Sequence, residues 1–143
     1  MGNSHLVTEL MESFESLQNE RVLSRLKLNY KGENVILYLL TELGGKSTPG
    51  KLCERVDFTA ARLSAIIKSL ESKGYIKRIQ NENDKRSTIV ALTPAGAEHF
   101  RSLKTDVIKS SLTIIEKLGE EDVRELLRII NRLSVIANSM EEM

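Results

Sequence analysis

The order of apolar and polar positions predicts a chain built mainly from helices. From about Ser4 to Ser24, apolar residues recur every three or four positions, which places an apolar stripe on one face of a helix. The members of this stripe are Leu6, Leu10, Phe14 and Leu17. A second stretch, from about Gly32 to Leu43, is rich in Val, Ile and Leu, and we expect it to form the central helix of the core.

Two shorter helices are predicted between Ser47 and Gly74. Thr48 before Pro49 is a helix start signal, because the hydroxyl caps the first turn and proline lacks only an N–H that has no helical partner there. Thr59 is a second cap, and the helix after it has apolar residues at i, i+3, i+4 and i+7. These residues are Leu63, Ile66, Ile67 and Leu70. Gly74 suits a left-handed stop, so the segment predicts a helix-turn-helix.

A hairpin with a long polar loop follows the second helix. Residues that favour a half-buried pleated surface predict two strands, with Ile76 and Ile79 in the first arm and Ile89, Val90 and Leu92 in the second. The loop from Gln80 to Arg86 contains no apolar residue. It is longer than the turn that closing a hairpin requires, so we interpret it as a projecting wing. The sequence therefore predicts a winged helix-turn-helix, a module that grips DNA.

The remaining segments are predicted to form dimerisation helices. Thr93 and Pro94 open a long helix that Gly119 ends, and the acidic run from Glu120 to Asp122 suits the N-terminus of a last helix. Along this last helix runs an apolar seam whose residues are spaced alternately three and four positions apart. It consists of Val123, Leu126, Ile130, Leu133, Ala137 and Met140. The seam favours packing against a second subunit, and packing within one chain is the alternative.

Several motifs resemble the MarR family of transcriptional regulators. They are Leu52-Cys53-Glu54-Arg55-Val56, the run from Arg62 to Arg78, Asp84-Lys85-Arg86-Ser87 and Leu92-Thr93-Pro94-Ala95-Gly96. Asp-Lys-Arg combined with Leu-Thr-Pro-Ala-Gly at this spacing is the specific part. The resemblance implies a homodimeric DNA-binding regulator, often a repressor released by a small ligand or by thiol oxidation. The implied fold is mainly α with a small β-hairpin, in a single domain over residues 1–143: a winged helix-turn-helix at about 32–96, with dimerisation helices at 1–31 and 97–143.

Two positions depart from the family pattern. Relatives often carry arginine or lysine near the start of the recognition helix, where this chain has Ala60 and Ala61. An acidic residue that can pair with the wing arginine is frequent where this chain has Lys68. Arg86 must therefore be steadied by Asp84 or by DNA alone, and the operator sequence of relatives does not transfer to this chain.

The predicted DNA contacts come from the second motif helix and the wing. We expect the helix from Thr59 to enter the major groove, with Arg62, Ser64 and Ser69 at or near base edges. Small residues allow close approach or contact with a thymine methyl, and Lys68 and Lys73 are expected at phosphates. The complete predicted set is Thr48, Thr59, Ala60, Ala61, Arg62, Ser64, Ala65, Lys68, Ser69, Lys73, Asp84, Lys85, Arg86 and Ser87.

The distribution of charge agrees with a DNA-facing module. The whole chain of 143 residues has a net charge of only +1. Residues 46–104 carry twelve basic and six acidic residues, a net charge of +6, whereas both flanking segments are net negative. Phosphate contacts require positive charge of this kind, although a chain this rich in charge also shows local excesses by chance.

Other classes of protein find less support in the sequence. No apolar run is long enough for a membrane span, the N-terminus lacks the pattern of a signal peptide, and a single cysteine fits a reducing cytoplasm, so we expect a cytoplasmic protein. His5 and His99 are isolated and no catalytic or metal-binding motif is present, so we expect neither an enzyme nor a metal or cofactor.

Cys53 is interpreted as core filling, with a redox sensor as the alternative. A protein-interaction module such as an anti-repressor is a further alternative.

Overall fold

The computed structural model describes residues 2–19, 21–80, 82–84 and 87–141. In these residues it contains helices α1–α7 and strands β1–β3, and their contacts divide the chain into two compact units. The first unit comprises residues 1–28 and 107–143, and the second comprises residues 29–106. The elements are α1 (Ser4–Asn19), α2 (Val22–Leu26), α3 (Glu33–Glu42), β1 (Lys46–Ser47), α4 (Pro49–Arg55), α5 (Ala60–Ser72), β2 (Ile76–Gln80), β3 (Thr88–Leu92), α6 (Pro94–Leu118) and α7 (Glu120–Glu141).

The second unit contains the buried core of the chain. The core brings together apolar side chains from α3, α4, α5, the sheet and the start of α6. The members that are almost fully buried are Ile36, Leu37, Leu40, Leu52, Leu70, Ile76 and Val90. The predicted stripe on α5 points into this core, since Leu63, Ile67 and Leu70 are buried and Ile66 is partly buried. The prediction that the apolar helix after Gly32 is central is therefore confirmed.

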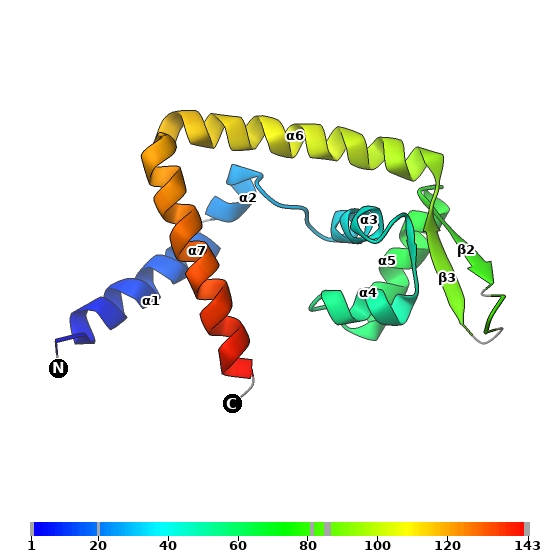
Figure 1. Cartoon of the computed structure of the whole chain (residues 1–143), viewed down its shortest axis with the longest axis horizontal. Helices are drawn as coiled ribbons and strands as arrows, with labels where there is room; N and C mark the ends of the chain where they lie inside the picture. Colours follow the sequence, from blue (N-terminus) through cyan, green and yellow to red (C-terminus); the bar gives the residue numbers. More distant parts are fainter. Residues whose placement is uncertain (1, 20, 81, 85–86, 142–143) are drawn as a thin grey trace. The chain divides into compact units, whose positions relative to one another are not determined.

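The hairpin lies in a three-stranded antiparallel sheet with the order β1-β3-β2. Ile79 lies opposite Ile89 and Arg78 lies opposite Val90, so the two predicted arms pair as expected. The sequence predicted only these two strands, and the structure adds β1, in which Lys46 pairs with Ala91. The β2–β3 hairpin extends to one side of α4 and α5 (Figure 1).

The motif Thr93-Pro94-Ala95-Gly96 begins α6 and contacts the residues that directly follow α5. The Thr93 hydroxyl donates to the carbonyl of Gly74 (2.6 Å) and accepts from the backbone N–H of Gly96 (3.0 Å). The Thr93 N–H also donates to the carbonyl of Tyr75 (3.0 Å). Gly96 is required for close packing, because a Cβ atom there would lie 2.0 Å from the Tyr75 carbonyl oxygen. These contacts fix the first turn of α6 against the chain that leaves α5.

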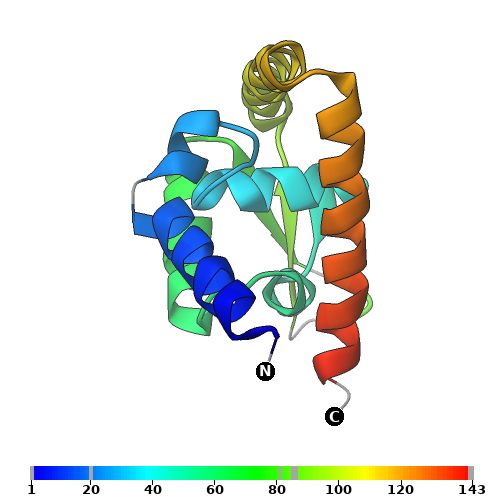
Figure 2. The ribbon, with the colours of Figure 1, turned by 90° about the vertical axis from the view of Figure 1, so that its left-hand side faces the viewer.

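The first unit contains α1, α2, α7 and the C-terminal part of α6. The helix predicted over about Ser4 to Ser24 is two helices, because α1 ends at Asn19 and α2 begins at Val22, after Arg21 with a left-handed φ of 55°. Gly119, with a φ of 88°, joins α6 to α7 in a sharp turn (Figure 1). Figure 2 shows α7 as one uninterrupted helix.

Both terminal helices expose their apolar faces in the isolated chain. On α1, Leu10 and Phe14 are 61% and 49% exposed, and on α7, Leu133 and Met140 are 48% and 63% exposed. The described residues of α1 and α7 include no buried side chain. In contrast, charged residues of α7 form ion pairs along the helix, Arg124 with Glu120 (2.7 Å) and Arg128 with Glu125 (2.5 Å).

Candidate nucleic-acid interface

The two helices of the predicted helix-turn-helix begin at threonine caps. The Thr48 hydroxyl accepts from the Lys51 N–H (3.3 Å) at the start of α4, and the Thr59 hydroxyl accepts from the Arg62 N–H (3.1 Å) at the start of α5. Pro49 stands in the first turn of α4, as predicted. Each hydroxyl has its own hydrogen left after it accepts this bond, so Thr59 could also donate to a phosphate at the helix N-terminus.

The face of α5 opposite the core presents small and basic residues. Ala61, Ala65 and Lys68 recur at spacings of four and three and are all exposed. Ser72 continues this row and is also exposed, although it was not in the predicted set. Alanine leaves the backbone of a helix accessible, so this face can approach a groove closely.

Arg62 is held at one edge of this face by an aromatic side chain. Its guanidinium carbon lies 4.1 Å from the centre of the Phe58 ring. Phe58 packs against the core, so the stack gives an exposed arginine a preferred orientation. A stacked guanidinium keeps its N–H groups at its edge, which suits bidentate recognition of a base or phosphate.

Ala60 and Ser64 occupy the other edge of α5, beside α4. Together with Arg78 of β2 they border a pocket of about 300 Å³. Its other lining residues are Pro49, Gly50, Cys53, Leu63 and Ile67. Most of these side chains are apolar, and the charged one, Arg78, forms an ion pair in which its Nε atom lies 3.4 Å from Glu71 Oε2.

Cys53 is only partly buried and packs against the core. Its Sγ atom lies 3.8 Å from the carbonyl oxygen of Phe58, and it lines the pocket between α4 and α5. The interpretation of Cys53 as core filling agrees with its packing. Its edge in the pocket, which the sequence did not predict, leaves the redox alternative open.

Ser69 and Lys73 are engaged by an acidic residue of α3. The Ser69 hydroxyl donates to Glu33 Oε2 (2.8 Å), and the Lys73 ammonium donates to Glu33 Oε1. The hydrogen bond from Lys73 holds the pKa of the Glu33 carboxyl below its ordinary value of 4.5, and Ser69 adds to this effect against the opposing effect of burial. The structure therefore places these two predicted DNA contacts beside α3, away from the row of Ala61 and Ala65.

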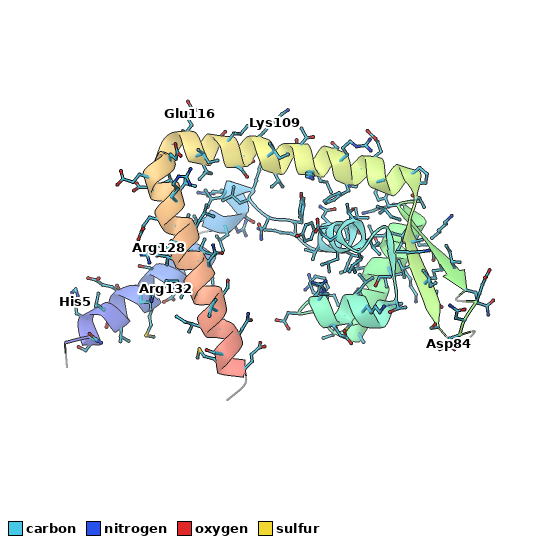
Figure 3. All side chains as sticks on the ribbon, viewed as in Figure 1. His5, Asp84, Lys109, Glu116, Arg128 and Arg132 are labelled. Atoms are coloured by element: carbon cyan, nitrogen blue, oxygen red, sulfur yellow. The ribbon has the colours of Figure 1, made fainter. Side chains whose placement is uncertain are left out.

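The tip of the hairpin is described only in part. The Asp84 backbone carbonyl accepts from the Ser87 N–H (3.1 Å) and hydroxyl (3.3 Å). Asp84 lies at the far end of the hairpin (Figure 3). The predictions for Lys85 and Arg86 fall outside the described residues, so the proposed support of Arg86 by Asp84 stays a prediction.

Glu33 and Arg78 lie beside predicted DNA contacts, and the sequence did not predict a role for either. Glu33 lies 40 positions from Lys73 in the sequence, so no helical or strand spacing predicts their contact. Arg78 directly follows Lys77 in β2, and its position opposite Val90 could have been inferred only from the hairpin register.

Two negative findings apply to the described part of the chain. His, Cys, Asp and Glu side chains there form no group of three suited to a metal ion. None of the helices described combines the length and apolar character that a bilayer crossing needs.

Comparison with known proteins assigns this geometry to a class. Residues 31–96 match the family model of a winged helix DNA-binding domain. The HTH-type transcriptional regulator SarZ of Staphylococcus aureus (strain USA300) is 28% identical over 137 residues, which cover 92% of this chain and 88% of SarZ. The uncharacterized HTH-type transcriptional regulator YcgE of Bacillus subtilis (strain 168) is 24% identical over 98 residues, or 68% of this chain. The chain spans only 62% of the length of YcgE.

Solved structures share the fold over nearly the whole chain. The MarR family transcription regulator SP03579 superposes with a TM-score of 0.79 at 18% identity, over 100% of this chain and 99% of that one. The organohalide-sensing regulator RdhR-CbdbA1625, solved with 2,4-dichlorophenol bound, gives a TM-score of 0.66 at 24% identity, over 90% of this chain and 78% of that one. At these identities the structures establish a common fold. Residues 31–96 are therefore a winged helix DNA-binding domain, in a chain that shares its fold with MarR family regulators and is similar in sequence to HTH-type transcriptional regulators.

Proposed function

We propose that this protein is a homodimeric, sequence-specific regulator of transcription that acts in the cytoplasm as a repressor. The observation that carries the proposal is the exposed face of α5, where Thr59 caps the helix and Phe58 orients Arg62 beside a row of small residues. A helix N-terminus, a preorganised arginine and small side chains suit insertion into the major groove. The charge of +6 in residues 46–104 supports phosphate contacts around this face.

Six of the predicted DNA contacts have distinct roles in this proposal. Arg62 and Ser64 face base edges from the two borders of α5, and Ala61 and Ala65 permit close approach between them. Lys68 contacts a phosphate. Arg86 of the wing is assigned to the adjacent minor groove on the sequence alone.

The test is a binding series on duplex DNA. Fragments selected by the purified protein supply the operator, and binding to operator and random duplex is then measured across salt concentrations. Arg62→Ala should reduce the discrimination between the two by about 1–3 kcal/mol per half-site. Lys68→Ala should weaken binding to both alike and flatten the slope of log affinity against log salt by about 1 unit per chain.

A matched control removes an arginine elsewhere in the chain. Arg124 is exposed on α7 and pairs with Glu120, so Arg124→Ala should leave the discrimination unchanged. Absence of salt-dependent binding by the wild-type protein would instead favour a protein-interaction module.

We further propose that a small molecule modulates DNA binding through the pocket between α4 and α5. The pocket adjoins Ala60 and Ser64, so a bound molecule would change the surface that faces DNA. Its apolar lining suits a small molecule with an apolar body, and an anionic group on that molecule would compete with Glu71 for Arg78. RdhR-CbdbA1625 binds a chlorinated phenol, which supports a search among phenols and aromatic acids. Arg78→Gln should abolish the release of DNA by such a compound if this pocket is the site.

The redox hypothesis concerns the same pocket, because Cys53 borders it. Cys53→Ala is expected to retain DNA affinity at a stability cost of roughly 1 kcal/mol. Release of the wild-type protein by peroxide, without release of the alanine variant, would favour a thiol sensor over core filling.

A further inference from the structure

The C-terminal end of α5 is bound to the rest of the second unit at several points. Thr93 donates to the carbonyl of Gly74, directly after the helix. The next residue, Tyr75, stacks on His99 of α6, with ring centres 4.3 Å apart and planes 8° from parallel. Glu33 adds the third attachment, through Ser69 and Lys73. In addition to the core packing along its length, α5 is therefore held by these attachments at the end that lies away from its capped N-terminus.

Among these attachments, the one through Glu33 involves the Lys73 ammonium, a positive group that DNA phosphates also attract. The Lys73 side chain is 49% exposed and its ammonium lies against a carboxylate that is only 28% exposed. A lysine in an ion pair is already neutralised, so it gains less from a phosphate and releases fewer counterions on binding DNA. Glu33 is the first residue of α3, where the helix dipole favours its negative charge.

We infer that Glu33 is a positioning residue for DNA recognition: its carboxylate holds Ser69 and Lys73, fixes α5 against α3 and withholds Lys73 from DNA phosphates. The inference rests on the proposed DNA-binding function of α5. It replaces the expectation that Lys73 is a phosphate contact in the native complex. The consequence is that Glu33 favours discrimination between sequences at the expense of non-specific affinity.

The experiment compares Glu33→Gln with Glu33→Gln/Lys73→Met and Lys73→Met. Glutamine keeps the size of the side chain and can still accept from Ser69, but it loses the ion pair. With Lys73 released, the affinity of Glu33→Gln for random duplex should rise, and its slope of log affinity against log salt should steepen by about 1 unit per bound chain. Lys73→Met alone, and the double variant, should both retain the wild-type slope.

Glu42→Gln is the matched control for the loss of one negative charge. Glu42 lies at the opposite end of the same helix and is exposed. If it steepens the slope as much as Glu33→Gln, general electrostatics accounts for the effect and the inference is wrong. It is equally wrong if Glu33→Gln has the wild-type slope, or if the steeper slope persists in the double variant.

A second measurement examines the positioning role without DNA. Glu33→Ala, which removes both contacts, should increase amide hydrogen exchange at the last turn of α5, from Ser69 to Lys73, while exchange at the Thr59 end stays near that of the wild type. Unchanged exchange in the last turn would contradict the positioning role. If the wild-type protein fails to bind any duplex in the salt series, the proposed function fails, and the exchange result still decides whether Glu33 fixes the helix.

Discussion

At the scale of single residues, Gly96 has a packing requirement that none of the other described glycines shares. A Cβ atom at this position would lie 2.0 Å from the Tyr75 carbonyl oxygen and 2.9 Å from Cδ1 of Leu92. The first contact is with backbone, so a change of side-chain rotamer cannot relieve it. The glycine of the Leu-Thr-Pro-Ala-Gly motif is therefore explained by close approach of two segments.

Gly96→Ala is expected to lower the free energy of unfolding by about 1–3 kcal/mol, the usual cost of an overpacked position. Gly50→Ala is the control, because space is open around Gly50 in α4 and alanine favours a helix. This control should be neutral or stabilising by up to about 1 kcal/mol. Urea unfolding followed by circular dichroism measures both, and equal midpoints for Gly96→Ala and the wild type would contradict the packing argument.

Glu33 makes the stability of the protein depend on pH. Its pKa in the folded state lies below the ordinary value of 4.5, because Lys73 and Ser69 stabilise the carboxylate. The unfolded chain therefore binds a proton at Glu33 more readily than the folded chain does. The stability that Glu33 contributes is fully present above about pH 4.5 and is lost as the pH falls through the lowered folded-state value.

The expected result is that Glu33→Gln is less stable than the wild type at neutral pH. The difference should shrink as the pH is lowered from about 4.5 through the lowered folded-state pKa, below which Glu33 is protonated in both states. Urea unfolding of the two proteins at a series of pH values gives this difference directly. A difference that is independent of pH would show that charge at Glu33 has no part in its contribution.

At the scale of elements, Thr93 connects the chain just after α5 to the start of α6. The Thr93 hydroxyl accepts from the Gly96 N–H in the first turn of α6 and donates to the Gly74 carbonyl just after α5. The start of α6 and the end of α5 therefore both depend on this side chain. The bond from the Gly96 N–H is part-buried, so its loss would be costly, whereas the bond to the Gly74 carbonyl is short but exposed.

Thr93→Val keeps the shape of the side chain and removes both hydrogen bonds. We expect it to lower the free energy of unfolding by about 1–2 kcal/mol, since loss of a cap typically costs about 1 kcal/mol. Thr113→Val is the matched control in the same helix, because the Thr113 hydroxyl only donates to the Lys109 carbonyl at an exposed position (3.1 Å). That variant should stay within about 0.5 kcal/mol of the wild type in thermal unfolding, and a similar loss in both would refute the capping argument.

At the scale of the whole molecule, the apolar faces of the first unit account for the proposed homodimer. Leu126, Ile130 and Leu133 recur along α7 and are each nearly half exposed in the isolated chain. A contiguous apolar face of this kind is typical of an interface. Obligate homodimers bury on the order of 2,000 Å² or more, and helices of this length can supply such an area. Figure 3 shows charged side chains of the same helix, among them Arg128 and Arg132.

Leu133→Asp is expected to give monomer or aggregate with little DNA affinity, because a carboxylate would be buried in the apolar seam. Val135→Asp is the control, since two residues further along a helix lies on the opposite face. Val135 is 70% exposed, and this variant should remain dimeric. Sedimentation at micromolar concentration distinguishes these outcomes, and a well-folded monomeric wild type would exclude the homodimer.

The sequence by itself determined the helices and the hairpin of the second unit, residues 29–106. Leu63, Ile67 and Leu70 repeat at helical spacing and are buried, and the two predicted arms pair in the structure, with Ile79 opposite Ile89. Caps also follow from sequence, because Thr48 and Thr59 bind N–H groups three residues further along the chain. In each case the pattern and the structure depend on residues that are near neighbours in the chain.

Only the tertiary structure decided the features that join distant segments. Strand β1 is two residues long and exists through its pairing with β3, and the contact between Glu33 and Ser69 spans 36 positions. The same physical reason explains why Ser69 was predicted beside DNA and is found bound to α3. Helical periodicity predicts which side chains lie outside the core, but contacts with neighbouring helices decide which of these side chains remain accessible to a ligand.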